Sequence, residues 1–195
     1  ICGVVLSTQR GPLALISAYV QPTTGDGLPQ LSSVVALAQR QFPLVLVGTD
    51  SNGHSPWWGP PDTLPSPLGR QAEDLILRHH LVIENIVDQG PTFEQDWVGG
   101  AQTYIDLTLS STSLSRLLRD WRVLSSLPLD TDHHALSYTV QLTPLMTTDR
   151  RLNWRKVHWD SFRPVLRQSL AQYLPTDFPL TCATDRSEER RVGKE

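Results

Sequence analysis

Asp50, Asn52 and His54 are spaced by two residues and closely follow the apolar run Leu44–Val47. That run contains enough apolar and β-branched residues to predict a buried strand. Alternate side chains of an extended segment point the same way, so the three groups can converge at the strand's carboxyl end, where open α/β sheets bind ligands. A carboxylate there can take a proton from water, and an amide can donate a hydrogen bond to a phosphoryl oxygen. A simple turn is the alternative, because Asp, Asn and Gly are turn formers.

Two later stretches offer groups that can complete such a site. Asp132 precedes His133 at the start of an alternating segment, and an acid beside a histidine can hold the tautomer of the imidazole and support its protonated form. Asp106 lies inside the β-forming run TYIDLTL, so it either faces solvent or has a partner such as His133. Tyr19, at a predicted strand end, can donate its hydroxyl to a phosphate oxygen or serve only in packing.

The remaining motifs exclude several classes of enzyme. The sequence contains no Gly-rich phosphate loop, CxxC pair, HExxH or GxSxG, which argues against nucleotide triphosphatases, zinc sites and serine hydrolases. Trp57 and Trp58 can either stack on a base or simply pack against a surface turn. His134 is expected to point away from the face that His133 occupies, and we assign it no role.

The composition is that of one globular domain with a modest extension. The 195 residues are 39% hydrophobic and 19% charged, and no apolar run approaches the length of a membrane span. The formal net charge of −3 means that any contact with nucleic acid must depend on a local patch. The two cysteines, Cys2 and Cys182, lack metal-ligand spacing and favour a reducing, intracellular compartment.

Strand and helix patterns alternate along the first 142 residues. Strands are predicted over 2–6, 13–20, 44–49, 81–83, 103–109, 121–125 and 134–142, with a short extended piece at 91–93. Helices are predicted over 28–40 and 70–80, with one or two helical turns at 114–118. Strands interleaved with helices in this way predict an α/β sandwich.

The chain changes character after Leu142. Residues 150–167 hold several Lys and Arg residues against a single acid, with Trp154 and Trp159 among them, and they indicate a basic linker. The last ten residues, RSEERRVGKE, match the in-frame translation of a common sequencing adapter. We therefore take 186–195 to be an assembly artefact and 143–185 to be the linker.

Taken in order, five pieces of the chain resemble one family. They are SAYVQP, GTDSNGHSPWWG, GRQAEDLILRHHLVIEN, the pair PTF and TYIDLTLSS, and TDHHAL. Over about residues 1–142 they resemble the endonuclease/exonuclease/phosphatase superfamily, and more narrowly the apurinic-type endonuclease domain of non-LTR retrotransposons. Three mild departures from the family's pattern are Thr49 for the Gly that commonly precedes the Asp, Gly53 for the Ala after the Asn, and Thr131 for the Ser of S-D-H. RLNWRKVHWDSFRPVL resembles the connector that precedes a reverse transcriptase in these elements.

The resemblance implies a fold and a set of roles. The fold would be a four-layered α/β/β/α sandwich, like that of deoxyribonuclease I and incomplete at its N-terminus. Asp50 would activate the attacking water, and Asn52 would bind the scissile phosphate. His133 would contact that phosphate or act in proton transfer, oriented by Asp106 or Asp132.

The resemblance also implies a metal and a further phosphate ligand. Tyr19 would hydrogen-bond the phosphate. The superfamily uses Mg²⁺, with Mn²⁺ as a second candidate, to stabilise charge in the displacement. Its main Glu ligand would lie before Ile1, and Asp132 is only a weak candidate for a metal ligand. We therefore expect this chain by itself to bind Mg²⁺ poorly and to cleave little or no DNA.

The function implied by the resemblance is that of a retroelement endonuclease. The parent protein would nick DNA in the nucleus and leave a 3′-hydroxyl that primes reverse transcription. DNA would be the direct partner, and the RNA of the element would be bound through a missing reverse transcriptase, with no membrane partner. A phosphomonoesterase of the same superfamily and a catalytically dead nucleic-acid-binding relic are the alternatives.

Overall fold

The computed structural model describes residues 1–95, 100–127 and 131–145, together with 158, 160–162, 164–165 and 168. The chain divides into two units, 1–147 and 148–195, and the fold described below belongs to the first. Most of the basic segment 150–167, and all of 186–195, lie outside the described residues. Among the described helices, none has both the length and the apolar character that crossing a membrane requires.

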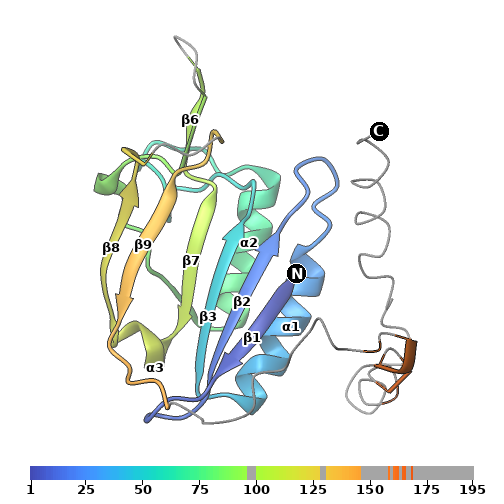
Figure 1. Ribbon diagram of the computed structural model, residues 1–195. Helices are drawn as coiled ribbons and strands as arrows, with labels where there is room; N and C mark the ends of the chain where they lie inside the picture. The colour runs from blue at the N-terminus through green and yellow to red at the C-terminus, as the bar shows by residue number, and fades with distance from the viewer. Residues whose placement is uncertain are drawn as a thin grey trace, which may run out of the picture. The chain divides into compact units, whose positions relative to one another are not determined.

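Five strands form one mixed sheet in the order β1-β2-β3-β7-β4 (Figure 1). The strands are β1 (Cys2–Leu6), β2 (Leu13–Tyr19), β3 (Leu44–Asp50), β7 (Asp106–Ser111) and β4 (Leu81–Ile83). β2 and β3 run parallel, whereas the other neighbours are antiparallel. A parallel pair needs a crossover connection, and the predicted helix, α1 (Leu28–Gln41), provides it between β2 and β3.

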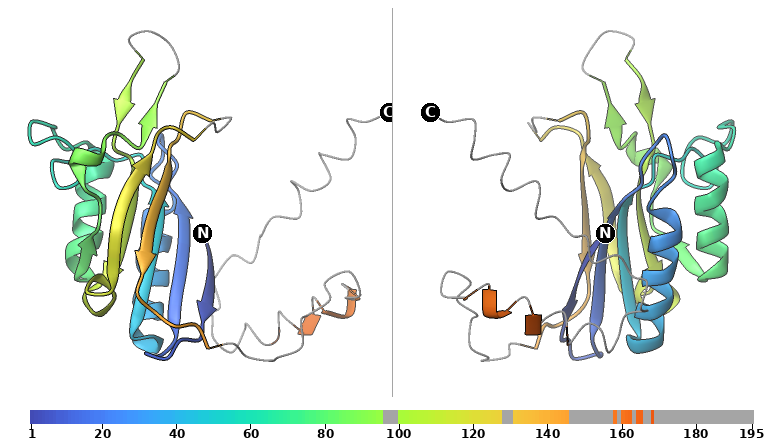
Figure 2. Two further views of the ribbon diagram at one scale, coloured as in Figure 1. Left: turned by 60° about the vertical axis from the view of Figure 1, so that its left-hand side comes forward. Right: turned by 90° about the vertical axis from the view of Figure 1, so that its right-hand side faces the viewer.

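Two helices cover one face of this sheet (Figure 2). The buried residues of α1 recur at intervals of three and four, and they pack with α2 (Pro67–Arg78) against apolar side chains of β2, β3 and β7. α2 begins earlier than the predicted residue 70. Its N-cap, Ser66, accepts a hydrogen bond from the backbone N–H of Gly69, and Pro67 suits the first helical position.

A two-stranded sheet packs against the opposite face. β8 (Leu118–Leu124) and β9 (Ala135–Val140) pair antiparallel, and α3 (Thr112–Ser115) connects β7 to β8. The interface between the sheets buries Leu13, Leu44 and Leu46 against Leu114, Leu118 and Trp121. The α/β sandwich is thus confirmed as layers of helix, sheet and sheet. Residues 1–145, where described, hold no further helical layer.

The predicted strand 103–109 is instead two strands. β6 (Gln102–Thr103) pairs with β5 (Phe93–Glu94), which follows the 3₁₀ turn η1 (Val87–Gln89), and β7 begins only at Asp106. Groups from the loops after β3 and before β5 satisfy part of the backbone around this break, and the backbone N–H of Ser51 donates to the carbonyl of Ile105 at 2.8 Å. The hydroxyl of Thr92 accepts hydrogen bonds from the N–H groups of Ile105 and Asp106, at 3.1 and 3.0 Å.

Candidate active site

Strand register places three of the predicted residues in one row. Tyr19 is the register partner of Asp50 in the parallel pair of β2 and β3, and Asp50 is the partner of Asp106 in the antiparallel pair of β3 and β7. All three lie where their strands end or begin, at the carboxyl edge of β3. The side chain of Tyr19 is 60% exposed, so its hydroxyl is accessible to a ligand at this edge.

His133 joins this row from the second sheet. It lies two residues before β9, and its Nδ1 is 3.1 Å from Oδ2 of Asp106. The ring of Phe93 meets the imidazole edge-on, with the ring centroids 5.0 Å apart. A carboxylate at this position accepts a hydrogen bond from Nδ1–H and so holds the tautomer whose Nε2 faces a substrate.

Asp132 and His134 flank His133 but do not join the cluster. The backbone carbonyl of Asp132 accepts a hydrogen bond from the N–H of Glu94 at 2.8 Å, and Asp132 is absent from the group of side chains close to Asp50. Nδ1 of His134 lies 3.1 Å from the carbonyl oxygen of Pro91. Of the two acids considered for holding His133, the structure brings Asp106 to the imidazole.

Asn52 is held in a left-handed turn beside Asp50. Its φ is 48°, a region that asparagine tolerates better than most residues. Its backbone N–H donates to Oδ1 of Asp50 at 3.2 Å, and its side-chain Nδ2 donates to the carbonyl of Val20 at 2.9 Å. The turn therefore fixes the amide next to the carboxylate, and the Asn52 side chain also hydrogen-bonds Asp50.

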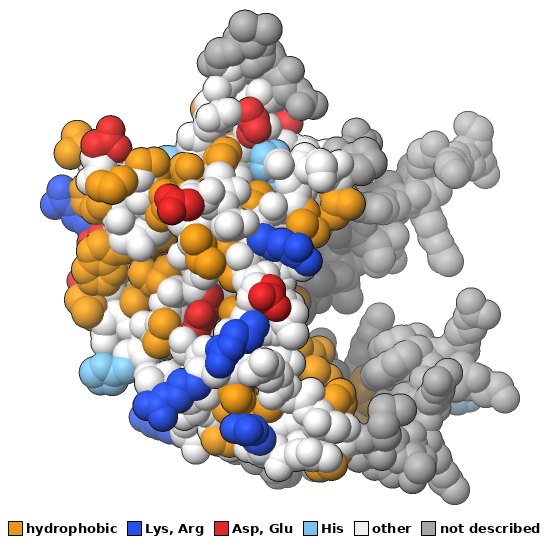
Figure 3. Space-filling view, turned by 90° about the vertical axis from the view of Figure 1, so that its left-hand side faces the viewer, with side chains coloured by type: hydrophobic (Ala, Val, Ile, Leu, Met, Phe, Trp, Pro, Cys, Tyr) orange, Lys and Arg blue, Asp and Glu red, His pale blue; other side chains and the backbone are white. Residues whose placement is uncertain are grey.

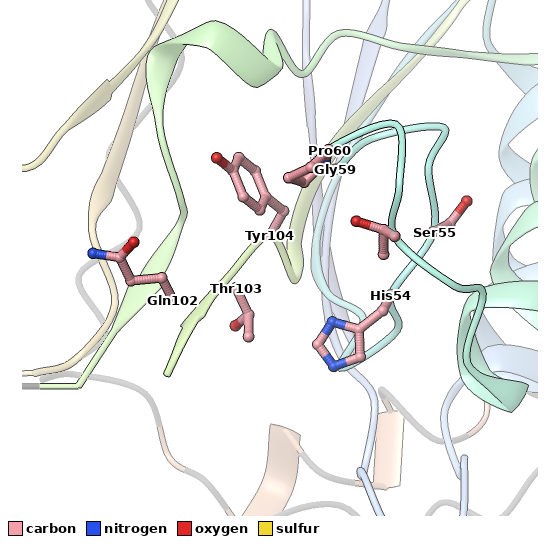
Figure 4. A pocket seen from close by; sticks show the side chains of 8 residues that line it. His54, Ser55, Gly59, Pro60, Gln102, Thr103 and Tyr104 are labelled. Atoms are coloured by element: carbon pink, nitrogen blue, oxygen red, sulfur yellow. The ribbon is translucent and has the colours of Figure 1, made fainter. Parts of the chain in front are cut away.

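His54 does not converge with Asp50, contrary to the alternation expected from the sequence. The strand ends at Asp50, and the left-handed residue Asn52 breaks the extended geometry that the alternation requires. His54 instead lines a cavity of about 200 Å³, whose other lining residues are Ser55, Gly59, Pro60, Thr63, Gln102, Thr103 and Tyr104 (Figure 4). The hydroxyl of Thr103 is buried there without a hydrogen-bond partner among the described residues. Neither Lys nor Arg lines this cavity, so it is poorly suited to a phosphate.

The three central side chains form a group that can hold a divalent cation. The candidate ligand atoms of Asp50, Asp106 and His133 all lie within 4.8 Å of one another. Burial and the negative charge of Asp106 raise the pKa of Asp50, against the opposing effects of the Asn52 N–H and His133. A cation between two carboxylates would relieve this repulsion, and carboxylate oxygens suit Mg²⁺ and Mn²⁺.

Two polar residues, the buried Ser51 and the half-buried Asn85, position the cluster and have no local signature in the sequence. Ser51 donates to the carbonyl of Ile105 from both its N–H and its hydroxyl, at 2.8 Å each. Nδ2 of Asn85 donates to the carbonyl of Asp106, and its Oδ1 accepts from the N–H of Thr108, at 2.8 Å each. Sequence reasoning missed these roles, because only the tertiary contacts distinguish these residues from ordinary loop residues.

The tryptophans after the motif have separate roles. Trp58 is fully buried, and its Nε1 donates to the carbonyl of Gly53 at 3.1 Å. Trp57 is 45% exposed. Of the two alternatives for this pair, Trp58 therefore anchors the turn in the core, and only Trp57 can contact a ligand.

The sandwich and its cluster of acids, amide and imidazole at the strand ends are those of a hydrolase of the endonuclease/exonuclease/phosphatase class. A family model described as endonuclease-reverse transcriptase matches residues 13–137. The chain belongs to this family, as its motifs predicted. No curated protein matches the chain.

Several solved structures share the fold, among them the following two. The endonuclease domain of TRAS1, a telomere-specific non-LTR retrotransposon, matches with a TM-score of 0.61 and 24% identity over 72% of this chain and 63% of that one. A 3′-5′ exonuclease (NExo) from Neisseria meningitidis matches with a TM-score of 0.54 and 14% identity, over 71% of this chain and 64% of that one. The chain thus spans somewhat less than two thirds of either structure.

Proposed function

We propose that the chain hydrolyses phosphodiester bonds in DNA with the help of Mg²⁺ or Mn²⁺, as the nicking domain of a retrotransposon. The observation that carries this proposal is the joining of Asp50, Asp106 and His133 at one sheet edge, within 4.8 Å of one another. An acid, a histidine and a phosphate-binding amide are the groups that hydrolysis of a phosphodiester needs. Membership of the endonuclease-reverse transcriptase family supports the same conclusion.

Each side chain has a role that its contacts permit. Asp50 is the proton acceptor for the attacking water, and its half-buried position makes the ionised form a stronger base. Asn52 and Tyr19 donate hydrogen bonds to oxygens of the scissile phosphate. His133 presents Nε2 to the phosphate while Asp106 holds Nδ1 at 3.1 Å.

The metal would be held by the two carboxylates, Asp50 and Asp106, with His133 as a third available ligand. A divalent cation stabilises the negative charge that develops on a phosphate during hydrolysis.

Conversion of supercoiled plasmid to open circles tests the proposal. One cut per plasmid is detected, so protein in excess over DNA reveals even the slow reaction expected of this chain. We expect nicks that need Mg²⁺ or Mn²⁺, stop with a chelator and carry a 3′-hydroxyl. Hydrolysis of small phosphomonoesters, while the plasmid remains uncut, would favour the phosphomonoesterase alternative. DNA binding without either reaction would favour the relic.

The partner of His133 supplies a separate prediction. Asp106→Asn should lower the nicking rate by about 10–100-fold, because the neutral amide no longer supports the imidazole at Nδ1. The neighbouring acid provides a matched control, and Asp132→Asn should leave the rate within about twofold, as expected for an acid outside the group of Asp50, Asp106 and His133. Single-turnover nicking rates for the two variants decide the matter, and equal losses would refute the assignment of Asp106.

We also propose the wider context that the resemblance implies. Residues 143–185 would form a basic linker toward a reverse transcriptase, and the RNA of the element would be bound by that enzyme. Such a protein would act in the nucleus, where its target DNA lies. The coding sequence on either side of this chain tests both points directly.

A further inference from the structure

The outer face of the second sheet carries a group of arginines that the proposed active site does not use. Arg119 and Arg122, together the arginine stripe, are exposed on β8, and Arg116 is exposed just before that strand. We infer that the arginine stripe binds the phosphate backbone of a nucleic acid that extends away from the active site. The inference rests on the proposed function, which puts the scissile phosphate of the nucleic acid at His133.

A β-bulge places two of these arginines on the same face. Residues three apart on a regular strand point in opposite directions. The register of β8 shifts between Arg119 and Arg122, and Asp120 takes a φ of 55° there. Arg119 consequently pairs with Thr139 and Arg122 with Ser137, and these partners are two residues apart on β9 and share a face.

The same bulge keeps the apolar residues of β8 inside. Leu118 and Trp121 are also three apart, and both are buried between the two sheets, at 6% and 4% exposure. Without the extra residue, one of the two would face solvent and one arginine would face the core. The bulge therefore preserves the core and directs both arginines outward.

The charge of the arginine stripe is not neutralised within the described fold. Both ion pairs among the described residues join a histidine to a carboxylate, so neither involves an arginine. Arg119 donates only to the carbonyl of the preceding residue, Leu118, at 2.7 Å. Asp120 is the one acid from 116 to 122, so the segment is net positive in a chain whose formal net charge is −3. Figure 3 looks onto the side of the molecule where β8 lies, and positive side chains gather in the lower half of that view.

The arginine stripe leads toward the active site. Arg122 pairs with Ser137, which lies four residues after His133 in the chain and therefore at most about 13 Å from it at the rise of an extended strand. Arg119 pairs with Thr139, about 7 Å farther from His133. A nucleic acid with its scissile phosphate at His133 would pass Arg122 first and Arg119 next.

A phosphodiester backbone is the ligand that this surface fits. The guanidinium fork of arginine matches phosphate oxygens, and it is less strongly hydrated than an ammonium group. The register partners Ser137 and Thr139 add neutral hydroxyl donors on the same face. Contacts to phosphate carry no sequence information directly, so this surface should bind without sequence preference.

The salt dependence of binding tests the inference with the whole chain. The double variant Arg119→Gln with Arg122→Gln is compared with a matched double variant on the helices, Arg40→Gln with Arg78→Gln, both of whose arginines are exposed. Binding to duplex DNA, single-stranded DNA and single-stranded RNA of one sequence is measured in chelator, which prevents cleavage. The melting temperature of each variant confirms that it is folded.

We expect the variant of the arginine stripe to reduce the salt slope for duplex DNA by about 1.8, or about 0.9 per lost phosphate contact. If the two phosphate contacts add nothing to the affinity at 1 M salt, their loss lowers the affinity for duplex DNA at 0.15 M salt about 30-fold. The helix variant should keep the wild-type slope. A salt slope that is reduced only for RNA would support binding of nucleic acid by the arginine stripe and would identify RNA as its ligand.

An unchanged slope for every nucleic acid, or an equal loss in the helix variant, would overturn the inference. Because binding is read without metal or cleavage, the test remains valid if no nuclease activity is found. If the chain nicks DNA but the salt slope of binding is unchanged, the proposed function is supported and only the inference about the arginine stripe is overturned.

Discussion

Asp50→Asn is expected to abolish metal-dependent nicking and at the same time to make the protein more stable. A general base contributes about 10²–10⁴-fold to a rate, and asparagine cannot take a proton from water. The substitution also removes a candidate metal ligand from the group with Asp106 and His133. The loss should therefore lie at the upper end of that range, measured as the single-turnover nicking rate in Mg²⁺.

The gain in stability follows from the cause of the raised pKa. Burial and Asp106 raise the pKa of Asp50 above its ordinary value of 3.8, so ionisation of this carboxyl is more costly in the folded state than in the unfolded chain. Stability is accordingly lost as pH rises from the unfolded pKa through the folded one. Asparagine avoids this loss. In chelator at pH 7 we expect a gain of about 1 kcal/mol, limited by solvent screening of a half-exposed group, and a melting temperature higher by about 2–4 °C.

Two comparisons make this prediction specific. The gain in melting temperature should vanish by about pH 3, well below the ordinary pKa of 3.8, where the wild-type carboxyl is protonated in both states. Asp88→Asn removes an exposed acid and should change neither the nicking rate nor the melting temperature. Nicking at the wild-type rate by Asp50→Asn would exclude Asp50 as the base. A lower melting temperature at pH 7 would contradict the electrostatic argument.

Gly69→Ala is expected to have the largest effect on folding among single-methyl substitutions near the site. A Cβ at Gly69 would lie 1.9 Å from the carbonyl oxygen of His54, which is backbone and cannot rotate away. The first turn of α2 would have to separate from the motif loop, where Ser66 accepts hydrogen bonds from His54 and Gly69 at 3.0 Å each. We expect a loss of about 3 kcal/mol, or about 6–12 °C in melting temperature.

Gly48→Ala provides the matched control for this prediction. Gly48 lies on β3, and nothing stands within 4 Å of where its Cβ would be. Alanine there should leave the melting temperature unchanged or slightly raise it, because it restricts the unfolded chain. Chemical denaturation of both variants, followed by circular dichroism, gives the comparison. Equal stability of the two would show that the loop and α2 separate without cost.

The sequence by itself determined the elements and the class of the protein. Apolar spacing of three and four predicts α1, and the apolar run before Gly48 predicts β3 and places Asp50 at its carboxyl end. Ordered motifs over 1–142 predicted the family, which the family model over 13–137 confirms. These features are local, because they depend on periodicity and on residue types a few positions apart.

The tertiary structure alone decided which groups meet. From sequence, Asp106 was equally a solvent-facing strand residue or a partner of His133, and the adjacent Asp132 was a competing partner. Strand register settles this, because β7 pairs with β3 so that Asp106 lies beside Asp50, and the second sheet then brings His133 to within 3.1 Å. The outward direction of Arg119 and Arg122 depends in the same way on a single bulge. Pairing and bulges arise from contacts between segments far apart in the chain, which local periodicity does not encode.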